Sequence, residues 1–171
     1  NVLAVDAGNA KAHALLALVY MEGSGRNKHR LELARTLVDE AKRLDPTNAF
    51  TLNAEGVLHM RRNSSADALA AFKSIPNDAN ATLNLALMTL RLEKYDDAYR
   101  LLTALKPTPS TEYTLAIATG VALRGQRKHA EADAAYQRAI KLAPQRADAH
   151  FNLGVLYMHH VAPAASDLDA M

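Results

Sequence analysis

Apolar residues recur along the chain at the three- and four-residue intervals of one helix face, and turns rich in Pro, Asn and Asp separate the apolar segments. No segment alternates between apolar and polar residues for long enough to predict a strand. The pattern therefore predicts an all-α protein. The expected helices run at about residues 10–22, 29–44, 48–61, 65–75, 79–92, 95–106, 110–125, 129–142 and 146–160.

The expected helices share a second pattern, in which one small residue recurs at a fixed position. The spacing from Ala86 to Gly120 is 34 residues, and so is the spacing from Gly120 to Gly154. Ala98 and Ala132, in the intervening helices, are also 34 residues apart. A fixed period of this length predicts stacked repeats of two helices each. A small side chain at mid-helix lets the paired helices approach closely.

The period is broken at two places. The first helix pair is five residues longer than the others, which predicts an insertion in the loop at residues 23–29. The second repeat is four residues shorter. This difference predicts that about one helical turn is missing near residues 73–78, where Pro76 ends the helix early.

The period and its marker residues resemble the tetratricopeptide repeat (TPR). The fit is best in the fourth repeat, where Gly120, Ala132, Tyr136, Ala139 and Pro144 match the small, small, aromatic, small and Pro positions. The resemblance implies a right-handed α-solenoid, a TPR-like superhelix of stacked antiparallel helix hairpins. It divides the chain into repeats at 10–48, 49–78, 79–112 and 113–146, a partial fifth repeat at 147–171, and the end of a preceding repeat at 1–9.

Composition and charge exclude several classes of function. The 20 basic and 18 acidic residues give a net charge of +2, without a dense basic block interleaved with aromatics, so nucleic acid is not an expected partner. The longest apolar run, at residues 12–21, is about half of the ~20 residues that span a bilayer, and no signal peptide is recognisable. We expect a soluble protein, cytoplasmic or periplasmic. Since it begins at Asn1 and shows no polar capping helix, we also expect a piece of a longer protein.

Motifs of catalytic or metal chemistry are missing from the sequence. There is no cysteine, no HExxH, no GxSxG and no GxxxxGK[ST] phosphate loop. His159 and His160 are adjacent, so on a helix their side chains point in different directions and do not form a metal site. His59 takes the place of a repeat aromatic and is expected to pack. We therefore predict no catalytic residue, no cofactor and no metal, and a protein that is not an enzyme.

The candidate functional surface is the inner face of the array. In TPR-like arrays the first helix of each repeat lines a concave groove that receives peptides or helices. The inner face is read from offsets to each mid-helix small residue, which form one helical stripe. The predicted partner-binding groove comprises Leu18, Met21, Asn53, Val57, Met60, Arg61, Leu83, Asn84, Leu87, Leu90, Arg91, Ile117, Val121, Arg124, Phe151, Asn152, Val155 and Met158.

The side chains of this groove indicate what it would bind. Its centre is apolar and includes flexible Met residues, which adapt to a partner's side chains. Arg61, Arg91 and Arg124 follow one edge, and Asn84 and Asn152 occupy equivalent positions from which they could hydrogen-bond a peptide backbone. TPR domains that clamp a terminal carboxylate carry Lys, Arg and Asn at positions that here are mostly Leu, Ala and Val, which argues against that subtype.

The sequence thus predicts a non-catalytic scaffold that binds a peptide or an amphipathic helix of a partner protein in its groove. The Ala- and Arg-rich composition is typical of bacterial proteins, and bacterial arrays of this type resemble assembly factors of the cell envelope. Two alternatives stay open: a regulatory or substrate-docking segment of a larger enzyme, and self-association through uncapped ends. The apolar face could also be covered by further segments of the same chain.

Overall fold

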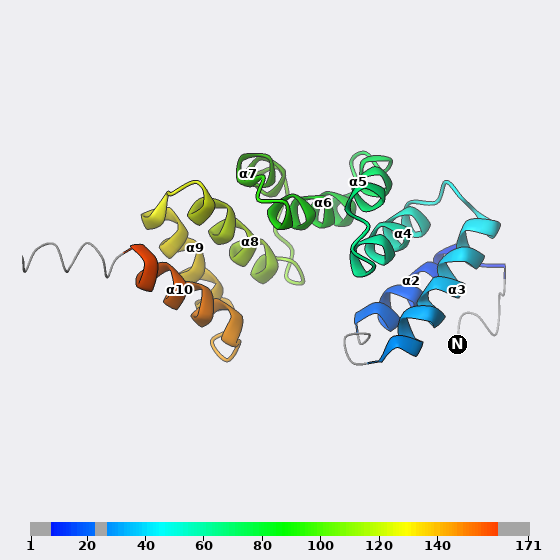
Figure 1. Cartoon of the computed structure of the whole chain (residues 1–171), viewed down its shortest axis with the longest axis horizontal. Coiled ribbons are helices and arrows are strands. Elements are labelled where there is room, and N and C mark those ends of the chain that lie inside the picture. Colours follow the sequence, from blue (N-terminus) through cyan, green and yellow to red (C-terminus); the bar gives the residue numbers. More distant parts are fainter. Residues whose placement is uncertain (1–7, 23–26, 161–171) are drawn as a thin grey trace, which may run out of the picture. The chain divides into compact units, whose positions relative to one another are not determined.

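The computed structural model describes residues 8–22 and 27–160, and this part of the chain contains nine α-helices and no strand (Figure 1). The all-α prediction is confirmed. The helices are α2 (Ala10–Glu22), α3 (Lys28–Leu44), α4 (Ala49–Arg61), α5 (Ser65–Lys73), α6 (Ala79–Arg91), α7 (Tyr95–Thr103), α8 (Glu112–Gly125), α9 (His129–Leu142) and α10 (Ala147–His160).

Most helix boundaries lie within two residues of the predicted ones, and the largest difference is at the end of α7. The helices α5 and α7 have nine residues each. Both end in a tighter turn, in which Ile75 N–H donates to Phe72 O at 3.2 Å and Leu105 N–H donates to Leu102 O at 3.2 Å. The predicted insertion falls mostly on residues 23–26, which lie outside the described residues, as do residues 1–7 and 161–171.

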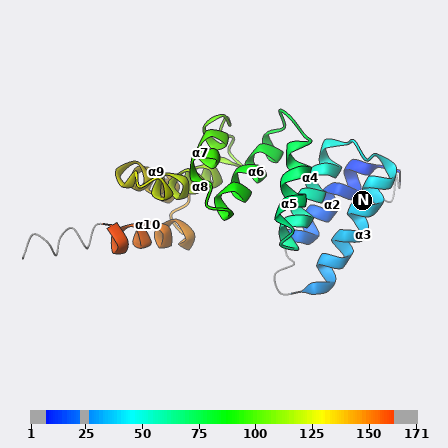
Figure 2. The ribbon, with the colours of Figure 1, turned by 45° about the horizontal axis from the view of Figure 1, so that its top comes forward.

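The chain forms two compact units, Asn1–Met88 (unit 1) and Thr89–Met171 (unit 2), and α6 crosses the boundary between them. In unit 1, α2 lies beside both α3 and α4, and α4 lies beside α5 (Figure 2). Side-chain caps begin four of its helices. Asn9 Oδ1 accepts from Ala12 N–H, Asn27 Oδ1 from His29 N–H, Asn48 Oδ1 from Phe50 N–H, and Asp78 Oδ1 from Ala81 N–H, at 2.8–3.0 Å.

The core of unit 1 is built largely from small side chains. Ala14, Ala17, Ala34, Ala41 and Ala54 have no exposed surface, which brings the backbones of α2, α3 and α4 close together. Larger buried side chains, including Val38 and Leu58, fill the space between these contacts.

In each unit, the two helices of one hairpin make close contact where a glycine of the first helix faces an aromatic ring of the second. A Cβ atom added at Gly56 in α4 would lie less than 3.0 Å from the ring of Phe72 in α5. A Cβ added at Gly120 in α8 would be equally close to the ring of Tyr136 in α9. Both rings are almost completely buried. The small residue therefore leaves room for an aromatic side chain that fills the hairpin.

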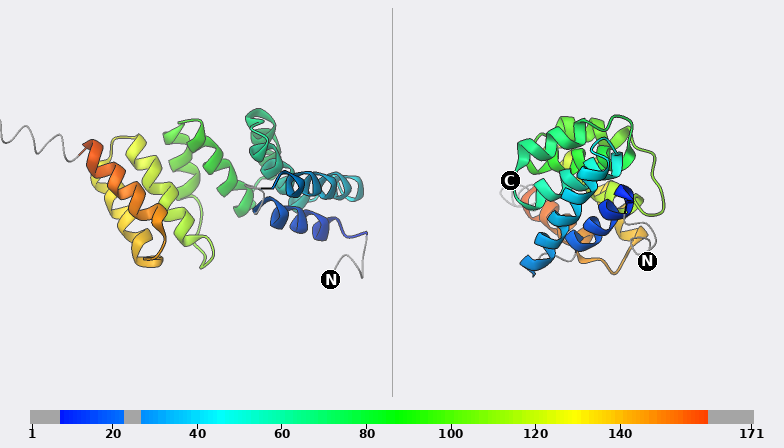
Figure 3. Two further views of the ribbon diagram at one scale, coloured as in Figure 1. Left: turned by 60° about the horizontal axis from the view of Figure 1, so that its bottom comes forward. Right: turned by 90° about the vertical axis from the view of Figure 1, so that its right-hand side faces the viewer.

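In unit 2, α8 lies beside α7 and α9, and α9 lies beside α10 (Figure 3, left). Its core includes Leu123, Ala132, Tyr136 and Leu156. A further close contact joins α8 to α7, because a Cβ atom at Gly125 would overlap the ring of Tyr95, starting with its Cγ atom.

The turn between the helices of a hairpin has the same backbone geometry at three places. Asn63, Glu93 and Arg127 have φ values of 59°, 57° and 62°, in the left-handed region. In each turn the N–H of the next residue reaches back to a carbonyl five positions earlier: Ser64 to His59, Lys94 to Thr89 and Lys128 to Leu123, each at 2.9 Å. This is the Schellman arrangement that ends a helix. The repeat is thus visible in the backbone as well as in the core.

A polar cluster ties the start of α8 to the turn before α10. The Tyr113 hydroxyl donates to Asp148 Oδ1, Arg146 Nη2 donates to Asp148 Oδ2 at 3.0 Å, and the Arg146 guanidinium lies 3.9 Å from the Tyr113 ring centroid. Burial alone would raise the pKa of Asp148, but the hydrogen bonds from Tyr113 and Arg146 outweigh it and hold the pKa below its ordinary value. The carboxylate form is therefore favoured in the folded state.

This cluster predicts a pH-dependent contribution to stability. A depressed pKa in the folded state stabilises the protein above the unfolded pKa of Asp, about 3.9, and the contribution disappears as pH falls through the folded value. Asp148→Asn should therefore reduce stability at pH 7, by up to about 1 kcal/mol because the cluster is largely solvent-accessible, and the difference from the unmodified chain should shrink from about pH 4 downward. Thermal unfolding from pH 2 to 7, with exposed Asp39→Asn as the control, measures it. A difference that does not depend on pH would contradict this role.

Candidate partner-binding site

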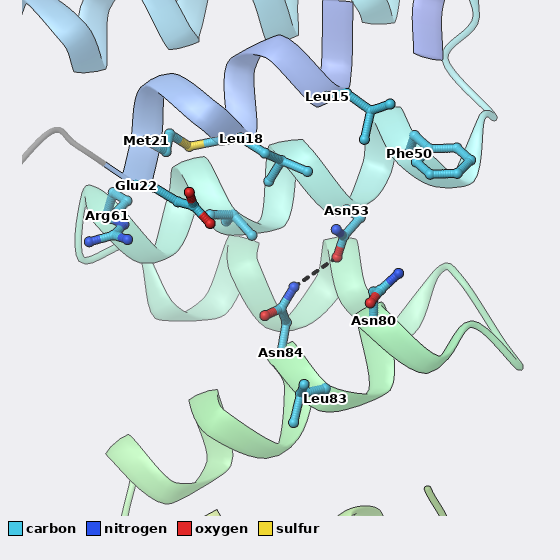
Figure 4. A pocket seen from close by; sticks show the side chains of 11 residues that line it. Leu15, Leu18, Met21, Glu22, Phe50, Asn53, Arg61, Asn80, Leu83 and Asn84 are labelled. Atoms are coloured by element: carbon cyan, nitrogen blue, oxygen red, sulfur yellow. Dashed lines mark hydrogen bonds between the residues drawn. The ribbon is translucent and has the colours of Figure 1, made fainter. Parts of the chain in front are cut away.

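Unit 1 contains a cavity of about 360 Å³ bordered by α2, α4 and α6 (Figure 4). Most of the residues that each helix contributes are spaced three or four positions apart, so they lie along one face. The cavity is lined by Leu15, Leu18, Met21 and Glu22 of α2, Phe50, Asn53, Val57 and Arg61 of α4, and Asn80, Leu83 and Asn84 of α6.

Six of the eleven residues that line this cavity are apolar. Leu15 is 42% exposed, while Leu18 and Val57 are half-buried against the core of unit 1. The Lys11 ammonium lies 4.4 Å from the ring centroid of Phe50, which also borders the cavity. The site thus offers partly exposed aliphatic and aromatic surface to a ligand.

Two amide side chains lie next to each other among these apolar groups. Asn84 Nδ2 donates to Asn53 Oδ1 at 2.9 Å, which links α6 to α4 (Figure 4). Asn53 is 8% exposed, so its position is set by the packing around it. The bond uses one atom of each amide. The Asn53 Nδ2 and Asn84 Oδ1 atoms lie outside that bond and provide a donor and an acceptor, the same pair of groups that a peptide backbone carries.

The charged residues of the cavity, Glu22 and Arg61, lie near each other at one end of it, close to the last turns of α2 and α4 (Figure 4). Both side chains are exposed. They give this end of the site one group of each sign, while the rest of its lining is uncharged.

The structure brings seven of the predicted groove residues together at this cavity. They are Leu18, Met21, Asn53, Val57, Arg61, Leu83 and Asn84. Met21 borders the cavity but has no exposed surface, so it supports the site from the core. Met60 packs against the core cluster of Phe72 and Met88 and is not among the lining residues.

Four lining residues are not among the predicted groove residues: Leu15, Glu22, Phe50 and Asn80. Leu15, Phe50 and Asn80 each lie three residues before a predicted one, Leu18, Asn53 or Leu83. The predicted stripe was therefore one helical turn too short at its beginning. The signal that could have found these residues is the same helical spacing, continued toward the N-terminus of each helix.

The remaining predicted groove residues do not line this cavity. Leu87 and Leu90 are half-buried and Arg91 is exposed. In unit 2, Ile117 and Val121 pack against the core beside Tyr136. The others are half-buried Arg124 and Val155, exposed Phe151 and Met158, and Asn152, whose Nδ2 donates to Asp148 O within its own helix at 2.8 Å.

Two further cavities lie in unit 2, and neither is lined by predicted groove residues. One, of about 240 Å³, lies against α7, α8 and α9, with Leu102, Leu115 and the Glu112–Arg138 ion pair among its lining. The other, of about 400 Å³, lies where α7 begins and α8 ends, next to Tyr95 and Gly125.

The ionisable side chains form no metal site in the part of the chain that the structure describes, since no group of three or more His, Asp or Glu residues there is placed to hold an ion. His59, which was expected to pack, is half-buried in α4, with Nε2 3.7 Å from Glu55 and Nδ1 3.9 Å from Asp67. None of the described helices is both long enough and apolar enough to cross a bilayer.

Helix hairpins closed by a glycine–aromatic contact and a repeated Schellman turn define a helical-repeat protein of the TPR type. Residues 120–160 match the TPR repeat family, and the chain has the all-α TPR-like fold. That fold is a protein-interaction fold, which implies protein partners. No curated protein is similar enough in sequence to count as a relative.

Solved structures of TPR-like proteins superpose on most of the chain. MamA (residues 41 to the end) from Desulfovibrio magneticus RS-1 has a TM-score of 0.67 at 20% identity, over 92% of each chain. PilF from Pseudomonas aeruginosa has a TM-score of 0.68 at 22% identity, over 91% of this chain and 71% of PilF. YrrB, described as a TPR protein with an unusual peptide-binding site, has a TM-score of 0.63 at 18% identity, over 92% of this chain and 81% of YrrB.

Proposed function

We propose that this protein is a non-catalytic interaction scaffold that binds a segment of a partner protein in the cavity of unit 1. The observation that carries the proposal is the cavity itself, which combines apolar walls with the Asn53–Asn84 amide pair. Ligand pockets in proteins typically combine apolar side chains with a few polar groups that fix the orientation of the ligand. YrrB, a protein of similar fold, is described as having an unusual peptide-binding site, which supports the same assignment.

The amide pair favours an extended peptide over a helix as the ligand. The backbone N–H and C=O groups of a helix are bonded within the helix, whereas those of an extended segment are available to Asn53 Nδ2 and Asn84 Oδ1. Alternate side chains of an extended segment point to the same side. Apolar residues at alternate positions would therefore contact walls such as Leu15 and Leu83, and a charged residue would lie near Glu22 and Arg61.

A matched pair of substitutions on α2 tests this site. Leu15→Asp places a carboxylate in the apolar wall, whereas Val19→Asp places one on the same helix at a residue that does not line the cavity and is 56% exposed. A peptide selected from a random display library against residues 1–171 serves as the probe, and fluorescence anisotropy measures its affinity. We expect Leu15→Asp to weaken binding at least tenfold, or about 1.4 kcal/mol, and Val19→Asp to leave it unchanged.

A second substitution separates backbone recognition from apolar contact. Asn84→Leu removes the amide acceptor but keeps a side chain of similar size. It should weaken the binding of an extended peptide. Circular dichroism controls for folding. Binding that withstands both Leu15→Asp and Asn84→Leu would place the peptide elsewhere and refute the proposed site.

The place of such a scaffold within a bacterial cell-envelope assembly is part of this proposal. MamA and PilF, whose folds are similar, come from the bacteria Desulfovibrio magneticus and Pseudomonas aeruginosa, which supports a bacterial source for this chain. Co-purification of tagged residues 1–171 from the source cell, with Leu15→Asp as the negative control, would identify partners that depend on the cavity.

A further inference from the structure

Within the described part of the chain, no ring lies opposite the glycine of α10, unlike its counterparts in α4 and α8. Gly56 and Gly120 each face an aromatic side chain sixteen residues later, Phe72 and Tyr136. No described atom outside the glycine's immediate surroundings lies within 4 Å of a Cβ built at Gly154. The residue sixteen positions after Gly154 is Ala170, and residues 161–171 contain no aromatic side chain. The sequence at the usual register therefore supplies no ring for Gly154.

The exposed face of α10 itself carries an aromatic side chain, Phe151. α10 packs against α9 and α8 through buried residues including Ala149 and Leu156. On another face, four exposed residues are spaced four, three and four positions apart, the spacing of a coiled-coil seam. This α10 stripe consists of Ala147, Phe151, Gly154 and Met158. Phe151 is 70% exposed and Met158 is 65% exposed.

The α10 stripe is complementary to itself in one orientation. When two copies of α10 run antiparallel with Phe151 of one copy opposite Gly154 of the other, Ala147 is opposite Met158, because both pairs of residue numbers have the same sum. Each large side chain then faces a small one, and the two-fold axis lies between Phe151 and Gly154. Contacts that repeat in this reciprocal way are the mark of an isologous dimer interface.

We propose that two copies of this chain associate through antiparallel α10 helices, with Phe151 of each copy packed on Gly154 of the other. The contact reproduces between chains the glycine–aromatic packing seen within the hairpins at Gly56 and Gly120. An interface made by one helix from each chain is smaller than the roughly 1,200 Å² of a stable complex, so the dimer is a weak one that depends on concentration. The inference is independent of the peptide site in unit 1.

Engineered cysteines test the orientation directly, because the chain has no cysteine of its own. Positions 147 and 158 are eleven residues apart, or about 16 Å along a helix, whereas disulfide-linked Cα atoms lie within about 7 Å. Under mild oxidation an equimolar mixture of A147C and M158C chains should form covalent dimers, and neither variant alone should do so. A mixture of V19C and M158C chains is the control for random collision, since Val19 lies in unit 1 and is 56% exposed.

The oligomeric state of the full 171-residue chain provides the second measurement. The mass from light scattering should rise from 18.5 kDa toward twice that value with concentration. Phe151→Ala should weaken the association at least tenfold, and Gly154→Leu should abolish it without lowering the thermal midpoint. A constant monomer mass, or cross-linking of A147C alone, would overturn the proposal. A lower midpoint for Gly154→Leu would also overturn it, because it would show that residues of the same chain cover this face.

Discussion

Replacing Tyr136 with Ala is expected to lower the free energy of unfolding by about 3–5 kcal/mol, the usual cost of truncating a buried aromatic side chain. Tyr136 has no exposed surface and lies in the core of unit 2 beside Leu123 and Leu156. Its ring also fills the space above Gly120, so the cavity left by Ala would extend between α8 and α9. Urea unfolding followed by circular dichroism measures the loss.

The matched substitution Tyr136→Phe should have little effect. The Tyr136 hydroxyl is buried and has no hydrogen-bond partner among the described residues, and burial raises its pKa above the ordinary value. Removing a buried hydroxyl that has no hydrogen-bond partner also removes its desolvation cost. The Tyr136→Phe variant should therefore be as stable as the unmodified chain, or more stable by about 1 kcal/mol. A loss as large as that of Tyr136→Ala would mean that the hydroxyl, and not the ring, stabilises the hairpin.

Gly125→Ala should destabilise the chain by about 1–3 kcal/mol, the usual cost of adding an atom to a packed contact. Ala is ordinarily favoured over Gly in a helix by about 1 kcal/mol, so a loss of stability would indicate the close contact with Tyr95. The added Cβ would overlap Tyr95 at Cγ, the ring atom nearest the backbone. Moving this atom aside requires a change of the Tyr95 χ1 rotamer or a shift of the start of α7.

Gly154→Ala is the matched control for this substitution, because the same change is made inside another helix, where no described atom outside the glycine's immediate surroundings lies within 4 Å of the new one. It should leave stability unchanged or raise it by up to about 1 kcal/mol. The two variants are compared by thermal unfolding at low concentration, where association through α10 is absent. Equal effects of the two substitutions would refute the close contact between α7 and α8.

The helices of this protein could be predicted from sequence because small residues at a fixed period constrain them. Gly120 was identified as a position of close approach from its period, and the structure shows that the ring of Tyr136 occupies the space beside it. Gly125 is not one of the small residues that recur with this period. Nothing in its spacing indicates Tyr95, since this contact joins different repeats and depends on how the repeats are rotated.

The candidate site could be predicted only in part. Residues on one face of one helix follow from periodicity, which is why Leu18, Asn53 and Leu83 were found together. Whether such faces enclose a cavity depends on the side chains between them and on the distances between helices. The hydrogen bond between Asn53 and Asn84, 31 residues apart, is a product of that packing, and one sequence contains no signal for it.

The three Schellman turns have a consequence for how this chain can vary. Their left-handed residues, Asn63, Glu93 and Arg127, differ in size and charge, yet their φ values lie within a few degrees of one another. The geometry of the turn is therefore dictated by the carbonyl that receives the returning N–H, and not by the identity of the turn residue. We therefore expect that substitutions at these three turn residues can change the surface charge of the molecule without changing the direction of the helices that follow.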